Sequence, residues 1–386
     1  MKEKKESKFK KIAGWFLRLP KRINVTVTVL LITATLISYA STVLNPGKYT
    51  AIPAFAGLGF PYILFVDVFY TMLLIFAKKW TAVFMILTIA FGYKRIDETV
   101  QLNPIHYLED FSKEDSSFTF MSFNVRLLDR YNWIDSKGGT KNKIFEFLKY
   151  ESPEIICFQE FYNNSKDSLP NCELIRDILK TDYVIRDYDE KDTVHKTDKG
   201  YIIFSKYPLC NRRPIFDFTD NMIGMSVDAD IFGKKVRIFN IHLKSIKLGY
   251  DDYDFIDKIE NKNNKEQLSG LGNIFTKISK AYQIRVKQAE YLSILIKQSP
   301  YPVILSGDFN EPPVSYCYNK IRKSGLEDAF CMSGTGFGET MRVKFLHFRI
   351  DYILHSKVIE SKRFRTHREN LSDHYAVSCK FKYSGQ

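Results

Sequence analysis

The chain has 386 residues, of which 45% are hydrophobic and 26% are charged, a balance that excludes a disordered or fibrous protein and allows one large domain with an appendage. The formal net charge is +13, but the first 23 residues alone carry nine Lys and Arg against two Glu. The positive charge is therefore weak evidence for nucleic-acid binding, because much of it belongs to a basic N-terminal tail at 1–23.

An apolar segment follows this tail. Residues 24–44 contain no charged residue, and about 20 such residues span the hydrocarbon core of a bilayer. Two shorter apolar runs follow at 61–77 and 80–93, so the sequence predicts a membrane region over 24–93 with three spans. The alternatives are one span followed by a dipping hairpin, and a signal peptide at the first run.

Positive charge sets the expected orientation. The basic N-terminus predicts a cytoplasmic tail, and three spans then place the rest of the chain outside the cytoplasm. We therefore expect an integral protein of a bacterial inner membrane with a periplasmic C-terminal domain. Residues 94–115 are polar and lack clear periodicity, which predicts a linker into a soluble domain at 116–386.

The soluble domain alternates short β-rich runs with polar or helical stretches. Runs of β-branched and aromatic residues bounded by turn formers predict strands at 117–125, 154–159, 201–205, 235–243, 302–306, 349–355 and 375–382. Apolar residues at helical spacing predict helices at 140–150, 172–180 and 273–298. The mixture predicts a layered α/β domain, and the polar stretch 245–272 predicts a long mobile loop.

Most of these strands have a carboxylate, amide or imidazole at or beside one end. The residues are Asn124, Glu160, His242, Asp308, Asn310, Asp351, Asp373 and His374. Each of them alone has a common structural explanation, such as a cap or a loop contact. Polar side chains at the ends of apolar strands are nevertheless where α/β folds place ligands, so their joint occurrence predicts one site.

Four carboxylates, two amides and two histidines suit a hard cation such as Mg²⁺ or Mn²⁺, which takes oxygen ligands and keeps water and phosphate in its shell. Glu160 and Asp373 are the ligands expected from residue type. His374, oriented by Asp351, is placed to contact phosphate or to carry a proton, because the pKa of histidine lies near working pH. Neutral hydrogen-bond donors to phosphate or water are expected from the amides of Asn124 and Asn310.

A family resemblance rests on seven motifs in a fixed order, SFNVR, CFQE, IFSKYPL, FNIHL, SGDFN, RIDYIL and SDHYAV. Together they resemble the endonuclease/exonuclease/phosphatase superfamily over about residues 116–384. That group includes DNase I-like nucleases, abasic-site endonucleases, bacterial sphingomyelinases and inositol polyphosphate 5-phosphatases. The resemblance implies an α/β (α+β) fold, a four-layer αββα sandwich with two central sheets and the site at one edge, here preceded by N-terminal transmembrane helices.

The resemblance also implies a metal centre. It assigns Glu160 as the main ligand of the ion. Asn124, Asp308 and Asn310 would surround the metal, the attacking water and the phosphate. Asp373 would lie beside the metal.

The remaining roles concern the substrate and its protons. The resemblance implies that His242 contacts phosphate or assists the leaving group, and that Asp351 pairs with His374. The general base stays open between Asp308 and His374.

Two departures from the family bear on the substrate. The stretch FRIDYIL stands where inositol 5-phosphatases have a Cys-Asp-Arg signature, and Arg126 stands where abasic endonucleases usually have an acidic residue. The arrangement looks like the membrane-tethered branch found in Bacteroidetes-type bacteria. A group of basic residues favours a polyanionic substrate; the alternative is that they form a solvated, charged helix face. The residues are Lys244, Lys247, Lys277, Lys280, Arg285 and Lys287.

The sequence thus predicts a divalent-metal-dependent phosphoesterase that hydrolyses a phosphodiester, in nucleic acid or a phospholipid headgroup, by attack of a metal-activated water. The alternatives are a phosphomonoesterase acting on a soluble phosphorylated metabolite, and an inactive binding or scaffold protein. The expected partners are the phosphate ester and the lipid bilayer, and no obligate protein partner is inferred.

Overall fold

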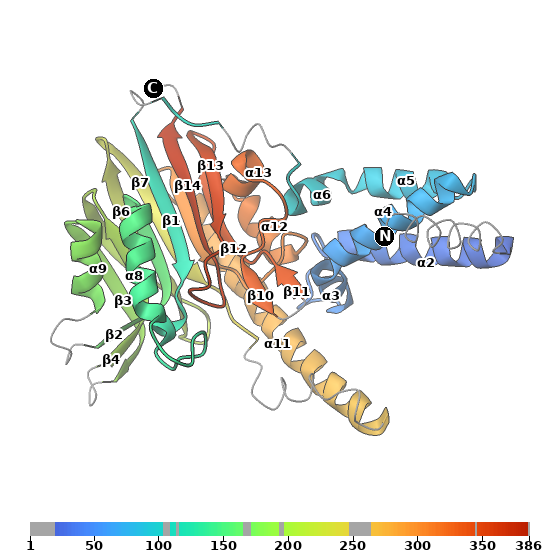
Figure 1. Ribbon diagram of the computed structural model, residues 1–386, viewed down its shortest axis with the longest axis horizontal. Coiled ribbons are helices and arrows are strands. Elements are labelled where there is room, and N and C mark those ends of the chain that lie inside the picture. Colours follow the sequence, from blue (N-terminus) through green and yellow to red (C-terminus); the bar gives the residue numbers. More distant parts are fainter. Residues whose placement is uncertain are drawn as a thin grey trace. The chain divides into compact units, whose positions relative to one another are not determined.

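The computed structural model describes residues 20–102, 109–112, 116–164, 171–192, 197–246, 264–343 and 346–384. The chain forms two compact units (Figure 1). The N-terminal unit comprises Met1–Thr99 with Pro313–Tyr316, and the C-terminal unit comprises Val100–Pro312 with Cys317–Gln386.

The described part of the N-terminal unit is helical. Its helices are α2 (Lys21–Ala40), α3 (Ile52–Leu58), α4 (Phe60–Phe76), α5 (Ala82–Phe91) and α6 (Tyr93–Thr99). By length and composition, α2 is the one described helix able to cross a membrane alone, and α3 with α4, bent by 68°, would make a second if they form one span. An N-terminal signal sequence passes the same test as α2, so three spans stay a prediction. The first residues of the predicted linker at 94–115 are helical, because α6 extends to Thr99.

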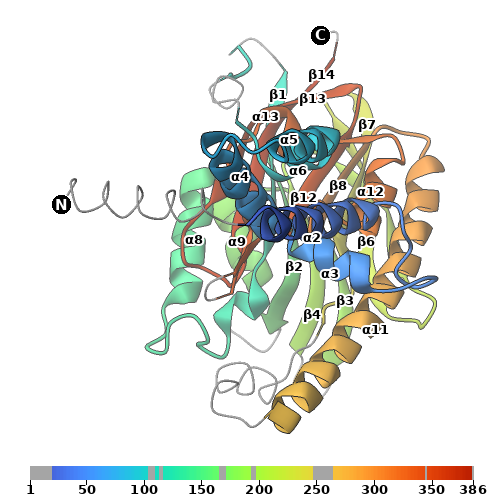
Figure 2. The ribbon, with the colours of Figure 1, turned by 90° about the vertical axis from the view of Figure 1, so that its right-hand side faces the viewer.

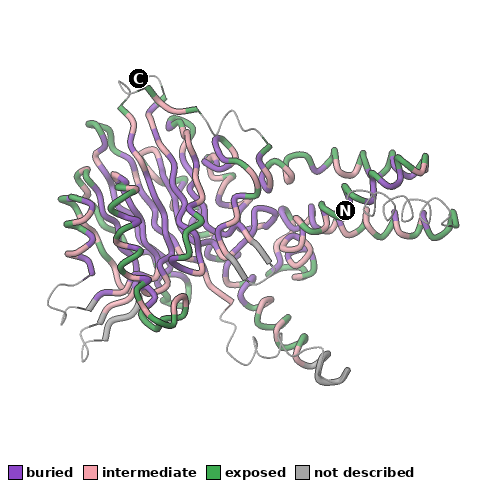
Figure 3. The backbone as a smooth tube through the Cα atoms, viewed as in Figure 1, coloured by how far each residue is buried: buried purple, intermediate pink, exposed green. Residues whose placement is uncertain are grey.

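Polar side chains face the interior of the N-terminal unit. Asn24 donates from Nδ2 to Oγ1 of Thr81 at 3.1 Å, and the hydroxyl of Tyr70 donates to Oδ1 of Asn24 at 2.9 Å. Thr35 donates to the buried carboxylate of Asp67 at 2.5 Å. Many positions of these helices are exposed (Figure 3). The exposed large apolar residues include Leu30, Phe65, Phe69, Phe76, Phe84 and Leu87.

Two six-stranded sheets form the C-terminal unit. The first has the order β13-β14-β1-β2-β4-β3. Its strands are β1 (Ser117–Asn124), β2 (Ile155–Asn164), β3 (Tyr183–Asp192), β4 (Thr197–Ser205), β13 (Ile359–His367) and β14 (Ala376–Tyr383). Alternate residues of β14, from Val377 to Tyr383, enter the core between the sheets, as the two-residue period of a strand requires.

The second sheet has the order β5-β6-β7-β8-β12-β9. Its strands are β5 (Leu209–Phe216), β6 (Met222–Ile231), β7 (Lys234–His242), β8 (Val303–Asp308), β9 (Leu326–Asp328) and β12 (Asp351–Ser356). A separate two-stranded hairpin is formed by β10 (Met341–Val343) and β11 (Leu346–Phe348).

Helices cover the outer faces of both sheets (Figures 1 and 2). They are α8 (Thr140–Glu151), α9 (Asn171–Leu179), α11 (Asn264–Lys297) and α12 (Tyr316–Arg322). The short helix α13 (Ala329–Ser333) instead contributes Ala329 and Phe330 to the core between the sheets. Ile144 of α8 and Ile175 of α9 share a core cluster with Phe158 of the first sheet. On the second sheet, the ring of Tyr318 in α12 lies 5.0 Å from that of Tyr352.

The inner core lies between the two sheets. Phe120 and Ile155 of the first sheet cluster with Val227, Ile304 and Ile353 of the second, and all five side chains are buried. Burying an aliphatic or aromatic side chain of this size contributes about 1.5–3 kcal/mol. The predicted four-layer αββα sandwich is confirmed.

Four long strands were not predicted. β3, β5 and β13 lie at sheet edges, whereas β6 lies inside the second sheet and is buried along almost its whole length. β5 (LCNRRPIF) is an edge strand, and most of its residues are exposed, so the alternation that signals a half-buried strand is missing. The predicted loop at 245–272 is also wrong at its end, because α11 begins at Asn264; residues 247–263 lie outside the described part.

Candidate active site

The topology brings the predicted site residues to one edge of the sandwich. β1 runs parallel to β2 and β7 runs parallel to β8, so each pair ends at the same edge. β12 is antiparallel to β8 and begins there, which puts His242, Asp308 and Asp351 side by side in register on three neighbouring strands. On the first sheet, Asn124 is the last residue of β1 and pairs with Gln159 of β2.

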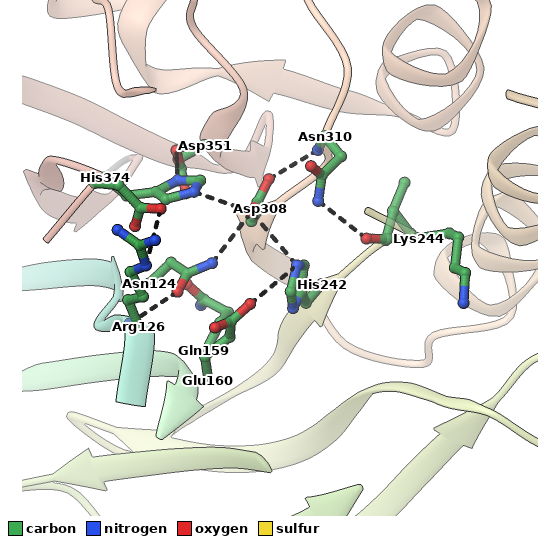
Figure 4. Close-up of polar contacts among 12 residues, drawn as sticks. Asn124, Arg126, Gln159, Glu160, His242, Lys244, Asp308, Asn310, Asp351 and His374 are labelled. Atoms are coloured by element: carbon green, nitrogen blue, oxygen red, sulfur yellow. Dashed lines mark hydrogen bonds and ion pairs between the residues drawn. The ribbon is translucent and has the colours of Figure 1, made fainter. Parts of the chain in front are cut away.

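Asp308 is the centre of the contacts at this edge (Figure 4). Its Oδ2 accepts a hydrogen bond from Nδ2 of Asn124 at 3.2 Å and lies 3.5 Å from Nε2 of His242 and 3.7 Å from Nε2 of His374. Its Oδ1 accepts from the backbone N–H of Asn310 at 2.8 Å. One buried carboxylate therefore touches residues from both sheets.

Asp351 and His374 form a hydrogen-bonded pair. Nδ1 of His374 lies 2.9 Å from Oδ2 of Asp351, and an ionised carboxylate can only accept, so Nδ1 carries the proton. Nε2 is left facing Asp308. The hydroxyl of Thr340 accepts the backbone N–H of Asp351 at 3.0 Å, which fixes the start of β12.

Burial and the nearby charges shift the pKa values of His374 and Asp308. Burial alone would lower the pKa of His374, but the carboxylates of Asp351 and Asp308 outweigh it and raise that pKa well above 6.5. Burial, followed by repulsion from Asp351, raises the pKa of Asp308 above its usual value, and the two histidines oppose the shift. Both shifts make Asp308 and His374 hold a proton more tightly than the free side chains do.

Glu160 owes its position to a bulge in β2. The pairing of β2 with β4 shifts register between Phe158 and Phe161, and Glu160 has a left-handed φ of 49°. A bulge re-aims the side chain it carries. The Glu160 side chain is 26% exposed, and its Oε1 lies 4.0 Å from Nε2 of His242.

The turn after β8 is equally specific. Asn310 has a φ of 52°, a conformation that Asn tolerates better than most residues, and its Nδ2 donates to the carbonyl of Leu243 at 3.1 Å. Gly307 has a φ of 137°, and a Cβ there would meet the carbonyl oxygen of Ile241 at 1.8 Å. Only glycine lets β8 approach β7 this closely just before Asp308.

A pair of buried amides behind the site was not predicted. Nε2 of Gln159 donates to Oδ1 of Asn240 at 2.7 Å, and Nδ2 of Asn240 donates to the carbonyl of Phe158 at 2.9 Å. Gln159 precedes Glu160, and Asn240 lies two residues before His242, so this pair joins the two sheets beside the site. The signal was an amide inside each apolar run, since buried amides need partners.

Arg285 was misinterpreted as part of a basic face. Its side chain is 1% exposed, Nε donates to Oε1 of Glu311 at 2.6 Å, and Nη1 donates to the carbonyl of Lys244 at 2.8 Å. Gln288, one turn further along α11, accepts the backbone N–H of Lys244 at 2.9 Å. The two α11 side chains thus hold the backbone just after His242; Lys247 lies outside the described residues.

Asp373 stands apart from the other carboxylates. Its Oδ2 lies 3.3 Å from Nε of Arg126, and its Oδ1 accepts from the hydroxyl of Ser372 at 3.2 Å. The structure places Asp373 next to His374 but pairs it with an arginine, so its role as a metal ligand stays a prediction.

The donor set fits a hard divalent cation. Ligand atoms of Asp308, Asp351 and His374 lie within 4.8 Å of one another. Because Nδ1 of His374 already binds Asp351, these two act as a hydrogen-bonded pair and not as two independent ligands. The oxygen atoms of Asn124, Glu160 and Asp308 are the kind that Mg²⁺ and Mn²⁺ prefer.

Known families match both parts of the chain. The profile of the Endonuclease/Exonuclease/phosphatase family matches residues 121–374. A domain of unknown function (DUF8431) matches residues 21–99. No curated protein matches the chain.

Solved structures with a similar fold have low sequence identity to this chain. An endonuclease/exonuclease/phosphatase from Bacteroides vulgatus is 16% identical with a TM-score of 0.49, over 69% of this chain and 99% of that one. Caenorhabditis elegans TDP2 is 18% identical with a TM-score of 0.45, over 71% of this chain and 77% of that one. The human Nocturnin catalytic domain is 15% identical with a TM-score of 0.46, over 74% of this chain and all (100%) of that one. These likenesses say nothing of the substrate.

Proposed function

Because the chain belongs to the endonuclease/exonuclease/phosphatase family, we propose that it is a divalent-metal-dependent phosphodiesterase acting on nucleic acid or a phospholipid headgroup. The observation that carries this is the convergence on Asp308 of an amide and two histidines, with Glu160 opposite His242. Hydrolysis of a phosphate ester needs such groups to bind the charged phosphoryl oxygens and to move one proton from water.

Glu160, Asp308 and Asn124 would hold the ion, with Asp373 at its edge. A bound Mg²⁺ or Mn²⁺ would polarise the phosphoryl oxygens and offset the charge of the transition state. The amide of Asn310 is positioned by its backbone bond to Asp308. Its oxygen is the available acceptor for a water, since Nδ2 is bound to Leu243.

His374 and His242 would serve the phosphate from two directions. Asp351 holds Nδ1 of His374 so that Nε2 points at Asp308. Either His374 or Asp308 would take the proton of the attacking water. Nε2 of His242 lies between the carboxylates of Glu160 and Asp308. It would contact a phosphate oxygen or protonate the leaving group.

We also propose that the protein is anchored in a membrane with its catalytic domain outside the cytoplasm. In α2 and α4, polar residues such as Thr35 and Asp67 are buried while Leu30 and Phe65 are 63% and 74% exposed. A water-soluble helix bundle has the reverse arrangement. Apolar surface of this kind is stable in contact with lipid.

The test uses the full-length chain in detergent with Mg²⁺ or Mn²⁺ and a panel of esters. The panel contains bis-p-nitrophenyl phosphate, p-nitrophenyl phosphate, plasmid DNA, RNA and sphingomyelin. We expect turnover of diesters that EDTA abolishes and that Glu160→Gln lowers about 10³-fold. Glu146→Gln, an exposed site on α8, is the matched control and should keep full activity.

Faster turnover of p-nitrophenyl phosphate than of any diester would replace this proposal with a monoesterase. Absence of metal-dependent turnover on every ester, from a folded protein, would favour a binding role.

A further inference from the structure

Two aromatic rings lie exposed in the segment that follows β1. Tyr131 is 57% exposed and Trp133 is 51% exposed, and their ring centroids are 4.8 Å apart at an angle of 46°. Aromatic side chains of this size usually bury 150–250 Å² each. Neither ring belongs to a core cluster among the described residues. Packing in a core therefore does not explain why two large aromatic side chains stand at these positions.

An arginine connects these rings to the active site. The guanidinium carbon of Arg126 lies 4.6 Å from the Trp133 ring centroid, and its Nε lies 3.3 Å from Oδ2 of Asp373. Figure 4 shows Arg126 beside Asn124 and His374. The Trp133 ring is therefore one side chain away from the residues proposed to bind phosphate.

A second arginine borders one of these rings. The guanidinium carbon of Arg130 lies 5.6 Å from the Tyr131 ring and 4.2 Å from the Tyr162 ring. The cluster of Arg126, Arg130, Tyr131 and Trp133, here named the aromatic subsite, thus combines two exposed rings with two positive charges, one beside each ring.

The backbone of this segment is strained and held. Residues 126–129 all have positive φ, between 42° and 58°, and non-glycine residues there cost about 1–3 kcal/mol each. Leu128 is buried in the outer core, and Asp129 accepts the backbone N–H of Ile134 at 3.0 Å. The side chain of Asn124 accepts the N–H of Arg126 at 3.2 Å, which ties the aromatic subsite directly to the catalytic edge.

We propose that the aromatic subsite stacks a nucleobase, so that the substrate is a single-stranded nucleic acid or oligonucleotide. A base presents a planar face to an aromatic ring whatever its identity. Arginine suits both stacking and phosphate contact, because its guanidinium is planar and always charged. The inference rests on the proposed phosphodiesterase activity of the adjacent site and names its substrate class.

The charges argue against the choline-type lipid headgroup. A quaternary ammonium binds aromatic faces through their negative π surface. Here Arg126 and Arg130 already occupy cation positions on these rings, so a second cation would be repelled. A nucleotide is not repelled in this way, because its base is neutral and its phosphate is negatively charged. The phosphate charge complements both arginines.

Trp133 provides a direct readout of binding. The chain has three tryptophans, and replacing Trp15 and Trp80 by Phe in the full-length protein leaves Trp133 as its only one. The protein in detergent and EDTA, which prevents turnover, would be titrated with hexathymidylate, hexauridylate and glycerophosphocholine. We expect saturable fluorescence quenching by the oligonucleotides and none by glycerophosphocholine, and the stronger oligonucleotide identifies DNA or RNA.

Arg126→Gln in this background should weaken oligonucleotide binding about tenfold. Arg176→Gln, on the distant helix α9, is the matched charge control and should leave binding unchanged. Equal quenching by glycerophosphocholine, or no quenching at all, would overturn the proposal.

Kinetics separate this inference from the proposed function. Trp133→Leu should raise KM for hexathymidylate about tenfold with a smaller effect on kcat, whereas Tyr150→Ala, at a ring that is 85% exposed on α8, should change neither. Normal hydrolysis with an unchanged KM in Trp133→Leu would refute the aromatic subsite and leave the phosphodiesterase standing. Quenching without any hydrolysis would refute the phosphodiesterase and leave the aromatic subsite standing.

Discussion

The hydrogen bond between Asp351 and His374 can be tested by changing one residue at a time. Asp351→Asn keeps the size of the side chain but removes the charge that holds the proton on Nδ1. We expect kcat/KM for bis-p-nitrophenyl phosphate to fall about 10²–10⁴-fold. His374→Gln should have a similar effect.

The two changes should also be non-additive, because either one disables the same pair. The double variant would then be about as slow as the slower single variant. Asp177→Asn, whose side chain is 66% exposed, is the matched control. Losses that simply multiply in the double variant would show that the two residues act separately.

His367 gives a prediction about stability and pH. Burial, with a smaller effect of Arg365, lowers the pKa of His367 to about 4. The folded protein therefore keeps this imidazole neutral while the unfolded chain protonates it near pH 6.5. The stability it contributes is present above that pH and is lost as pH falls toward 4.

The loss amounts to about 3 kcal/mol. It is measured as the free energy of unfolding of the full-length protein between pH 7 and pH 4. His367→Gln should flatten this part of the curve, whereas His355→Gln tests a second buried histidine whose pKa burial also lowers. An unchanged pH dependence in both variants would mean that neither histidine governs acid stability.

The sequence identified which residues meet at the catalytic edge better than it identified what supports them. Asn124 and Asp308 stand at strand ends, where a local pattern of apolar run and polar end marks them, whereas Glu160 lies at a bulge inside β2, a strand that continues past its predicted end. Gln159 and Asn240 bond across two sheets and are 81 residues apart in the chain. No local pattern reveals such a partner, and the chemical roles of the site residues remain predictions.

At the scale of elements, the close approach of β7 and β8 makes the clearest prediction. Gly307→Ala would force a methyl group into the Ile241 carbonyl and a side chain onto a φ of 137°. We expect a loss of about 2–4 kcal/mol in unfolding free energy, together with lower activity because Asp308 follows directly.

Gly272→Ala is the matched control within the same chain. Its Cβ would meet nothing within 4 Å, and it lies inside α11, where alanine is favoured over glycine by about 0.5–1 kcal/mol. Guanidinium unfolding curves of both variants decide the matter. Equal stability of Gly307→Ala and the parent protein would show that the strands can separate without cost.

Burial accounts for several of the predicted and missed strands, but not for β6, which is buried along almost its whole length and was still missed. β1, β8 and β14 lie inside their sheets and carry apolar residues on the core side, so composition reveals them. β13 (IESKRFRTH) is an edge strand with a register shift between Lys362 and Arg365. Its charged residues contact solvent and neighbouring side chains instead of packing in a core, and its sequence therefore resembles a loop.

For the whole molecule, orientation in the membrane is the property that charge alone predicted. A fusion of alkaline phosphatase after Glu109 should be active, because the basic N-terminus is expected to stay in the cytoplasm. Green fluorescent protein at the same point should be dark. An inactive phosphatase with a bright cytoplasmic reporter would place the catalytic domain inside the cell and contradict the predicted topology.

The division of the site between two sheets has a consequence for any assay of this protein. Asn124 and Glu160 are anchored in one sheet, whereas His242, Asp308 and Asp351 are anchored in the other. Neither half of the sandwich holds all the residues of the proposed site, so we expect a proteolytic fragment or a half-folded intermediate to be inactive. The measured activity should then be proportional to the fraction of intact, folded protein. A partly cleaved preparation should lose activity in that proportion and should contain no form with a low residual rate.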